Sequence, residues 1–211
     1  MSRWLQNILP ILAVVALLLV LTMVKRESPA PPEVSGTIFL DPPRALSPFY
    51  LIDQHGAVID RARLEGRWTL LFFGYLNCPE VCSATLAALA AAQEQLSIID
   101  AGSEELQVMF VSVDPHRDTP EAVARYLSRF NAAFVGAVAE PTALSGLGDQ
   151  FGVTWRRGSD QPGGGYSVEH SPMIFVINPD VQWCASLSPP LKASLLTEAV
   201  RAIRTKNELV D

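Results

Sequence analysis

The sequence predicts an α/β domain of three layers, in which helices cover both faces of a mixed central sheet. Two continuous apolar runs, residues 68–75 and 106–113, have the length and composition of strands buried on both faces. Helical patterns alternate with strand patterns up to residue 152, which is typical of crossover connections between strands. The chain then closes with a hairpin pattern and a final helix.

An apolar segment near the N-terminus stands apart from this domain. Residues 8–24 are apolar at all but two positions, which suffices for a helix of about 25 Å that spans a bilayer. A cleaved signal peptide is the alternative, but the residues from Lys25 onward offer no small-x-small cleavage site. We therefore expect residues 1–26 to be a single-pass membrane anchor. Positive charges flank the run on both sides, so they leave its orientation open.

The segment after this anchor is rich in proline. Residues 27–48 contain six prolines, and this composition favours extended, polyproline-like chain. We expect a linker that holds the domain, residues 49–211, away from the membrane. The domain begins with a predicted β-hairpin, in which strands at 49–52 and 57–59 flank a turn containing Gly56.

The remaining elements follow from local signals, such as prolines that occupy the first turn of a helix. Residues 156–167 are polar and glycine-rich and predict a mobile loop. The order of the elements matches a thioredoxin-like fold with an added N-terminal hairpin. The expected strands are 68–75, 106–113, 134–139, 173–178 and 182–187, and the expected helices are 79–98, 120–130, 141–150 and 191–207.

Charge and cysteine content limit the function. Beyond residue 26 the chain carries 13 Lys and Arg against 22 Asp and Glu, with no basic cluster, so nucleic acid is an unlikely partner. Three cysteines are too few for a fold held together by disulfides. Two of them are only four residues apart, which points to a site.

Cys78 and Cys82 are the first candidates for chemistry. Cys78 stands where a predicted strand ends and a helix begins, and the positive end of the helix dipole there lowers the pKa of a thiol. Cys82 follows one helical turn later, on the same face. Two soft sulfur ligands suit Cu(I), and a third ligand would complete a trigonal site. The pair alone also fits an inert buried pair or a local disulfide.

His170 is the candidate third ligand. It lies between the glycine-rich loop and the predicted strand 173–178. In a thioredoxin-like domain this segment passes beside the N-terminus of the first helix, where the two cysteines lie. An imidazole there can bind Cu(II) as well as Cu(I). A lone histidine is more often an ordinary polar residue, so the case for His170 rests on this placement.

Three segments resemble motifs of the Sco/SenC family of cytochrome c oxidase assembly proteins. Residues 73–82 (FGYLNCPEVC) resemble the family's FGYTxCPDxC segment, residues 112–120 (SVDPHRDTP) its SVDPxRDTP segment, and residues 169–171 (EHS) its DHS segment. The departures are Leu76 for Thr, and Glu80 and Glu169 for Asp. They leave the candidate ligands in place.

This resemblance implies a thioredoxin-like fold and copper bound by Cys78, Cys82 and His170. It further implies delivery to the binuclear copper centre of cytochrome c oxidase subunit II, with other copper chaperones as further partners. An N-terminal anchor in the inner membrane with the domain on the outer, periplasmic face follows from the same resemblance.

Other residues are weaker candidates. Asp114, at the carboxyl end of a predicted strand, could orient the site from a second layer or cap its own loop. Pro172 falls where thioredoxins keep a cis proline, and both isomers stay open. His55 and His116 are expected to be solvated, and Cys184 to act as a small apolar residue.

Two functions remain. The first is a metallochaperone that binds copper through Cys78, Cys82 and His170 and passes it on by ligand exchange. The second is an enzyme, a thiol–disulfide reductase in which Cys78 attacks an acceptor disulfide and Cys82 resolves the mixed disulfide. Such enzymes usually carry two residues between their cysteines, whereas three occur here, and they need no histidine at position 170.

Overall fold

The structure is a computed structural model that describes residues 34–99, 105–160, 165–189 and 191–208. The predicted membrane anchor, residues 1–26, lies outside these ranges. Within them, no helix is long and apolar enough to cross a bilayer. The described chain contains ten strands, four α-helices and one short 3₁₀ helix.

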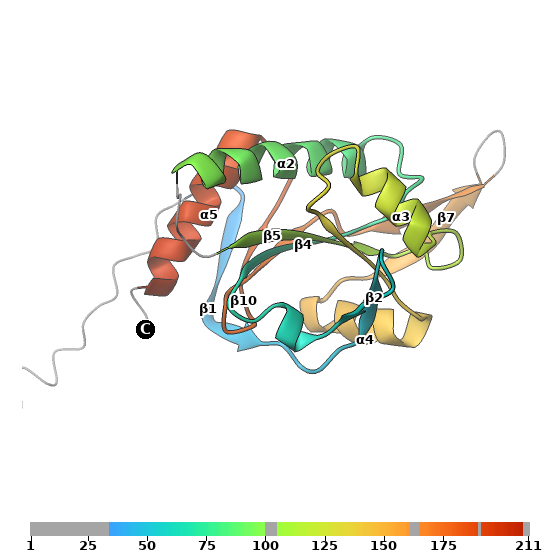
Figure 1. The fold of residues 1–211 in the computed structure, drawn as a ribbon, viewed down its shortest axis with the longest axis horizontal. Coiled ribbons are helices and arrows are strands. Elements are labelled where there is room, and N and C mark those ends of the chain that lie inside the picture. Colours follow the sequence, from blue (N-terminus) through green and yellow to red (C-terminus); the bar gives the residue numbers. More distant parts are fainter. Residues whose placement is uncertain (1–33, 100–104, 161–164, 190, 209–211) are drawn as a thin grey trace, which may run out of the picture. The chain divides into compact units, whose positions relative to one another are not determined.

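Strands and helices alternate through the middle of the chain, as the sequence pattern predicts (Figure 1). The strands are β1 (Thr37–Ala45), β2 (Leu51–Asp53), β3 (Val58–Ile59), β4 (Trp68–Gly74), β5 (Leu106–Ser112), β6 (Val135–Val138), β7 (Trp155–Asp160), β8 (Tyr166–His170), β9 (Ile174–Ile177) and β10 (Gln182–Leu187). The helices are η1 (Arg61–Arg63), α2 (Val81–Ile99), α3 (Pro120–Leu127), α4 (Pro141–Phe151) and α5 (Ala193–Glu208).

Eight of these strands form one mixed sheet in the order β1-β10-β9-β4-β5-β6-β2-β3. Strands β4, β5 and β6 run parallel, and the other neighbours pair antiparallel. Helices α2 and α5 lie on one side of the sheet and α4 on the other (Figure 1). The predicted three layers and the predicted hairpin, now β2 and β3, are therefore confirmed.

The centre of the sheet is the hydrophobic core of the domain. All seven residues of β4 are buried, as are six of the seven residues of β5. Burial on both faces explains why the two strands read as continuous apolar runs rather than as alternating patterns. Burying each large aliphatic side chain here contributes about 1.5–3 kcal/mol to folding.

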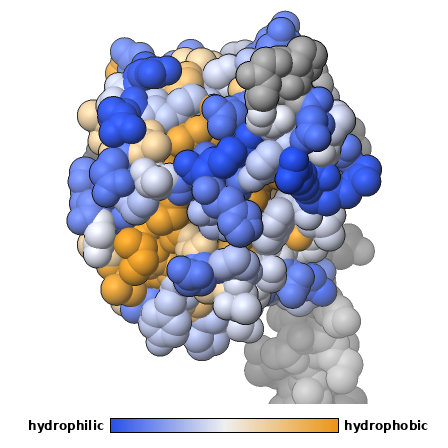
Figure 2. Space-filling model, turned by 90° about the vertical axis from the view of Figure 1, so that its right-hand side faces the viewer, coloured by the Kyte–Doolittle hydropathy of each residue, from blue (hydrophilic) through white to orange (hydrophobic). Residues whose placement is uncertain are grey.

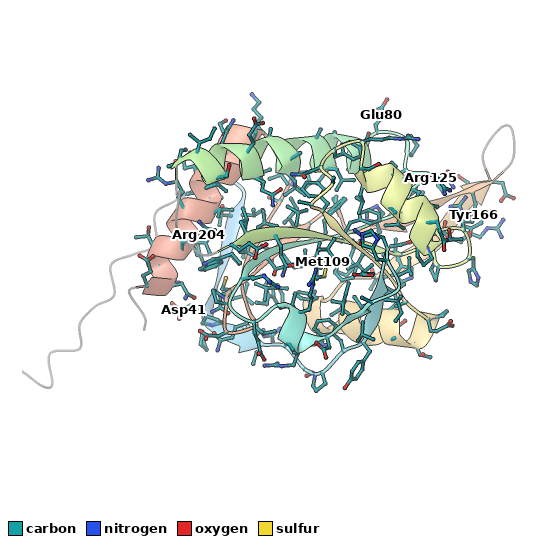
Figure 3. The ribbon with its side chains drawn as sticks, viewed as in Figure 1. Asp41, Glu80, Met109, Arg125, Tyr166 and Arg204 are labelled. Atoms are coloured by element: carbon teal, nitrogen blue, oxygen red, sulfur yellow. The ribbon has the colours of Figure 1, made fainter. Side chains whose placement is uncertain are left out.

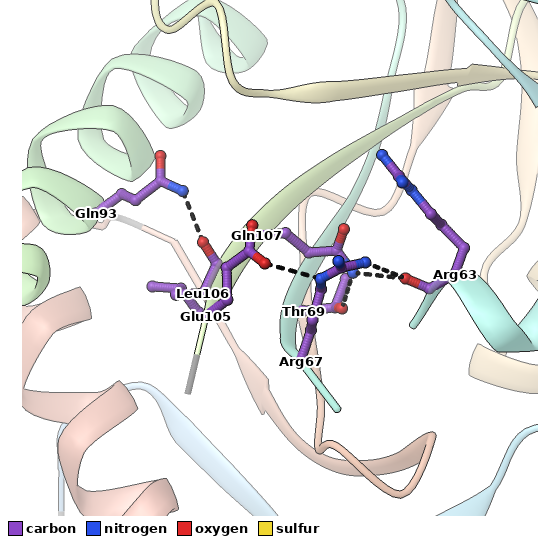
Figure 4. A network of polar contacts seen from close by, with 7 residues as sticks. All are labelled: Arg63, Arg67, Thr69, Gln93, Glu105, Leu106 and Gln107. Atoms are coloured by element: carbon purple, nitrogen blue, oxygen red, sulfur yellow. Dashed lines mark hydrogen bonds and ion pairs between the residues drawn. The ribbon is translucent and has the colours of Figure 1, made fainter. Parts of the chain in front are cut away.

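A polar network lies at the amino-terminal ends of β4 and β5, away from the cysteines (Figure 4). The buried Gln107 Nε2 donates to Thr69 Oγ1 at 2.8 Å across the parallel pair, and Gln93 of α2 donates to the Leu106 carbonyl at 2.7 Å. Arg67 and Glu105 form an ion pair at 2.9 Å beside them. These contacts join the two strands and α2, so they help to fix the register that places the carboxyl end of β4.

The predicted linker, residues 27–48, is wrong in its later, described part. Residues 37–45 form β1, which pairs antiparallel with β10 at one edge of the main sheet. The register shifts between Phe39 and Arg44, around Pro42 and Pro43. Proline lacks an N–H but is tolerated at edge strands and bulges, and this explains how a proline-rich segment joins a sheet. This part of the expected spacer therefore belongs to the domain.

The predicted mobile loop at 156–167 is also wrong in its described part. Strands β7 and β8 pair antiparallel in a separate two-stranded sheet. Most of their side chains are polar and partly or fully exposed, so the sequence shows no buried face that would have predicted strands. The end of the domain that carries this hairpin is largely hydrophilic, with an apolar patch beside the hydrophilic side chains (Figure 2).

Candidate metal centre

The three candidate ligands meet at the carboxyl end of β4. Cys78 lies in the turn after β4, Cys82 in the first turn of α2 and His170 at the end of β8. Their ligand atoms all lie within 4.8 Å of one another. The structure thus brings together residues that are 88 positions apart in the sequence.

The N-terminus of α2 sets the state of the two sulfurs. The helix begins at Val81 rather than at the predicted Pro79, so Cys78 lies in the turn ahead of it. The backbone N–H of Cys82 donates to Cys78 Sγ at 3.4 Å. Hydrogen bonding from the Cys82 thiol, and further from His170, lowers the pKa of Cys78 to about 4 despite partial burial. The low pKa predicted for Cys78 is therefore present, but the Cys82 thiol contributes more to it than the backbone N–H at the helix terminus.

Cys82 is in the opposite state. Its side chain is fully buried, and its hydrogen bond to Cys78 together with this burial raises its pKa far above the ordinary value. The site therefore holds a thiolate at Cys78 and a thiol at Cys82, and the thiol donates a hydrogen bond to the thiolate. A metal that uses both sulfurs has to displace the proton of Cys82.

The His170 ring is oriented by its neighbours. Its Nδ1 lies 3.0 Å from the Ser171 carbonyl oxygen, and its Nε2 lies 3.7 Å from Cys82 Sγ. In a neutral ring whose proton is on Nδ1 and donated to this carbonyl, the Nε2 lone pair would be available to a metal ion. The rings of Tyr75 and Phe72 pack edge-on against the imidazole, with centroids at 5.7 Å and 6.3 Å.

This donor set fits a soft metal ion. The set consists of two sulfurs and one imidazole nitrogen and includes no carboxylate. Such ligands bind Cu(I) and zinc well, whereas magnesium and calcium prefer oxygen ligands. Cys78 and His170 are half-buried, whereas Cys82 is fully buried. The centre is therefore open on the side of Cys78 and His170 and closed behind Cys82.

Comparison with known proteins assigns most of the domain to one family. The SCO1/SenC family model matches residues 40–205. The chain belongs to the SCO1/SenC family. Among solved structures, copper-bound ScoI of Arabidopsis thaliana is similar with a TM-score of 0.70 and 28% identity, over 75% of this chain and 98% of that one. This match confirms the predicted thioredoxin-like fold.

Two relatives of known name match most of this chain. A protein of Stutzerimonas stutzeri, named for copper binding, is 32% identical over 158 residues, which are 75% of this chain and 76% of that protein. The mitochondrial SCO2 homolog of Bos taurus is 31% identical over 153 residues, which are 72% of this chain and 57% of that protein. The chain thus spans a little over half the length of its bovine SCO1/SenC relative.

Asp118 is a site residue that sequence reasoning missed in this SCO1/SenC chain. Its buried carboxylate accepts hydrogen bonds from the Leu76 N–H at 3.1 Å and the Ser112 hydroxyl at 2.6 Å. Burial raises the pKa of this carboxyl. Asp118 thereby ties the loop before α3 to the turn that carries Cys78. Its place in the SVDPxRDTP-like segment was the available signal, but that resemblance alone gave Asp118 no role at the site.

The predicted role of Asp114 takes a specific form. The Asp114 carboxylate is buried and accepts hydrogen bonds from Arg117 Nε and, at 2.8 Å, from the Tyr166 hydroxyl of β8. Its backbone carbonyl also accepts from the Asp118 N–H. Asp114 therefore caps its own loop and at the same time contacts the strand that carries His170.

The weaker candidates of the SCO1/SenC domain are outside the cluster. His55 and His116 are exposed, as expected. Cys184 is buried and its thiol donates to the Val176 carbonyl, in agreement with an apolar structural role. Among the described residues Asp41–Pro42 is the one cis peptide bond, so Pro172 follows a trans bond.

Cys78 and Cys184 are expected to differ sharply in their rates of alkylation. Because the pKa of Cys78 is about 4, its rate with iodoacetamide should be nearly constant from pH 6 to pH 8 in the metal-free protein. Burial raises the pKa of Cys184 to about 12, so this residue should stay unmodified. Mass spectrometry of the timed reaction measures both. A Cys78 rate that rises about tenfold per pH unit over this range would contradict the low pKa.

Gly74, which ends β4, is expected to tolerate no side chain. A Cβ at this position would lie 2.7 Å from the Phe110 ring and 3.2 Å from Cys82 Sγ. We expect Gly74→Ala to lower the free energy of unfolding by about 1–3 kcal/mol, as overpacking does, and to displace Cys82. Urea denaturation measures the first effect and copper titration the second. Gly146→Ala is the control, because a Cβ in that exposed helix position meets open space.

Proposed function

We propose that this protein is a copper metallochaperone that binds copper through Cys78, Cys82 and His170. The observation that carries the proposal is the convergence of two sulfurs and one imidazole within 4.8 Å from three separate elements. Membership of the SCO1/SenC family and the copper in solved Sco structures support copper as the metal.

The geometry suits a metal that is held and then released. The Cys78 thiolate is charged before copper arrives and is accessible, so it is suited to first contact. Cys82 then loses its proton and becomes the inner ligand, and His170 Nε2 completes a trigonal set. For release, a thiolate of the acceptor replaces the half-buried ligands first, because the buried Cys82 sulfur cannot be approached until they let go.

The acceptor that we propose is the binuclear copper centre of cytochrome c oxidase subunit II. The motif resemblance and the family's association with oxidase assembly support this choice. We further propose that residues 1–26 anchor the protein in the inner membrane with the domain on the periplasmic face. Protease treatment of intact spheroplasts checks this placement: the domain should be degraded there and protected in inverted vesicles.

A copper titration of the full-length chain in detergent tests the metal site. We expect His170→Ala to lower Cu(II) affinity by at least about tenfold and to change the sulfur-to-copper absorption, since a ligand is lost. His116→Ala is the matched control, because this exposed histidine lies outside the cluster. Unchanged affinity and spectrum in His170→Ala would show that the site does not use three ligands.

A second candidate function, thiol–disulfide reduction, is favoured by one observation. The low pKa of Cys78 beside the high pKa of Cys82 is the asymmetry that an attacking thiolate and a resolving thiol need. The two functions share the same sulfurs. Rapid reduction of an oxidised fragment of oxidase subunit II by the metal-free dithiol protein would favour the enzyme, whereas transfer that requires copper would favour the chaperone.

A further inference from the structure

His170 is placed by a hairpin that is separate from the main sheet. Strands β7 and β8 pair only with each other within the described residues, and His170 is the last residue of β8. The two cysteines, in contrast, are fixed by β4 and α2 in the core. The distance between His170 and the sulfurs therefore depends on what fastens this hairpin.

One attachment lies directly beside the imidazole. Trp155 is the cross-strand partner of His170, and its ring packs so closely on Gly148 of α4 that a Cβ there would come within 2.5 Å of it. Val168, on β8, is buried in the core. These contacts hold the base of the hairpin on the domain, and Val168 lies on the same face of β8 as Tyr166 and His170.

A second attachment lies four residues before His170, at Tyr166. The Tyr166 ring is enclosed between two guanidinium groups, with Arg117 Cζ at 3.6 Å and Arg157 Cζ at 4.3 Å from its centroid. Its hydroxyl donates to Asp114 at 2.8 Å, and Asp114 also forms an ion pair with Arg117. We call Asp114, Arg117 and Tyr166 the latch.

Tyr166 and Glu80, which precedes α2, lie toward the same end of the domain (Figure 3).

Arg117 connects the latch to the wall of the metal centre. Its guanidinium also lies 6.0 Å from the Tyr75 ring centroid, and Tyr75 packs edge-on against His170. Arg117 Nη2 is buried and has no hydrogen-bond partner in the described part of the chain, although burying such a donor is unfavourable. The groups that hold this guanidinium are the Asp114 carboxylate and the rings of Tyr75 and Tyr166.

We propose that Tyr166 and Arg117 are positioning residues for His170. They touch none of the three ligand atoms, but they hold β8 so that the imidazole stays within reach of the two sulfurs. The inference rests on the proposed copper site. When the latch opens, His170 can leave the metal while Cys78 and Cys82 keep it, and this would lower the number of ligands without opening the core.

The test compares latch variants with and without His170. Tyr166→Leu removes the ring and hydroxyl but keeps most of the volume, and Arg117→Gln removes the guanidinium. Each is made in the full-length chain and in its His170→Ala variant, and Cu(II) affinity is measured by competition with a chelator. Arg125→Gln, at an exposed arginine of α3, is the control. Electron paramagnetic resonance reports whether an imidazole nitrogen is bound to Cu(II).

We expect each latch variant to lower Cu(II) affinity about 10- to 100-fold and to weaken the nitrogen signal when His170 is present. In the His170→Ala background the same substitutions should change nothing further. An unchanged affinity in a folded latch variant, or an equal loss with and without His170, would overturn the inference. Failure of the proposed site itself would look different, because His170→Ala alone would then have no effect.

Discussion

Cys82→Ser is expected to lower copper affinity about a hundredfold or more. The substitution removes the inner ligand, and even changes at residues that only orient ligands cost about 10- to 100-fold. A Cys82→Ala variant also lacks any side-chain donor to the Cys78 thiolate, whereas the serine hydroxyl keeps one, so the pKa of Cys78 should rise in the alanine variant. Chelator competition measures the affinity, and the pH dependence of alkylation measures the pKa.

Cys184→Ser is the matched control for this result. Cys184 is also buried, but it lies in β10 and its thiol contacts the Val176 carbonyl rather than the site. Copper affinity and the alkylation profile of Cys78 should stay as they are in the unmodified chain. A Cys82→Ser variant that keeps its copper affinity would mean that Cys78 and His170 suffice, and the trigonal site would have to be abandoned.

Asp118→Ala is expected to lower the free energy of unfolding by about 2–4 kcal/mol, since it leaves the Leu76 N–H and the Ser112 O–H without an acceptor in the interior. The turn that carries Cys78 should loosen as well. Urea denaturation measures the stability, and hydrogen exchange at the Leu76 amide measures the local loosening.

Two further variants test whether the Asp118 carboxylate itself causes this loss of stability. Asp118→Asn keeps a carbonyl acceptor and should recover part of the lost stability. Glu140→Ala replaces an exposed acid that makes no side-chain capping bond at the start of α4, so it should leave stability nearly unchanged. If Asp118→Ala were as stable as Glu140→Ala, the carboxylate would not be what holds the turn.

Much of the fold was predictable because its central strands are buried on both faces. The runs that became β4 and β5 carry an unbroken apolar signal, and the prolines at 120 and 141 mark the starts of α3 and α4. The cysteines and His170 were predictable for a different reason. Their positions relative to strand ends, together with the motif resemblance, placed them at one edge of the sheet.

The missed elements share one property: their stability comes from partners and not from their own side chains. β1 contains two prolines and pairs through β10, and the polar strands β7 and β8 pair with each other. A local pattern cannot show such pairing. Asp118 was missed for a related reason, because its partner Leu76 lies 42 residues away and only the folded chain brings the two together.

The two edge strands of the main sheet affect how readily these domains aggregate at high concentration. An open edge strand offers unpaired backbone groups on which a neighbouring molecule can build an intermolecular sheet. Here one edge is β1, whose Pro42 and Pro43 interrupt the row of donors, and the other is β3, which is only two residues long. Neither offers a long, regular template, so the domain is protected against aggregation by edge-to-edge pairing even at high local concentration.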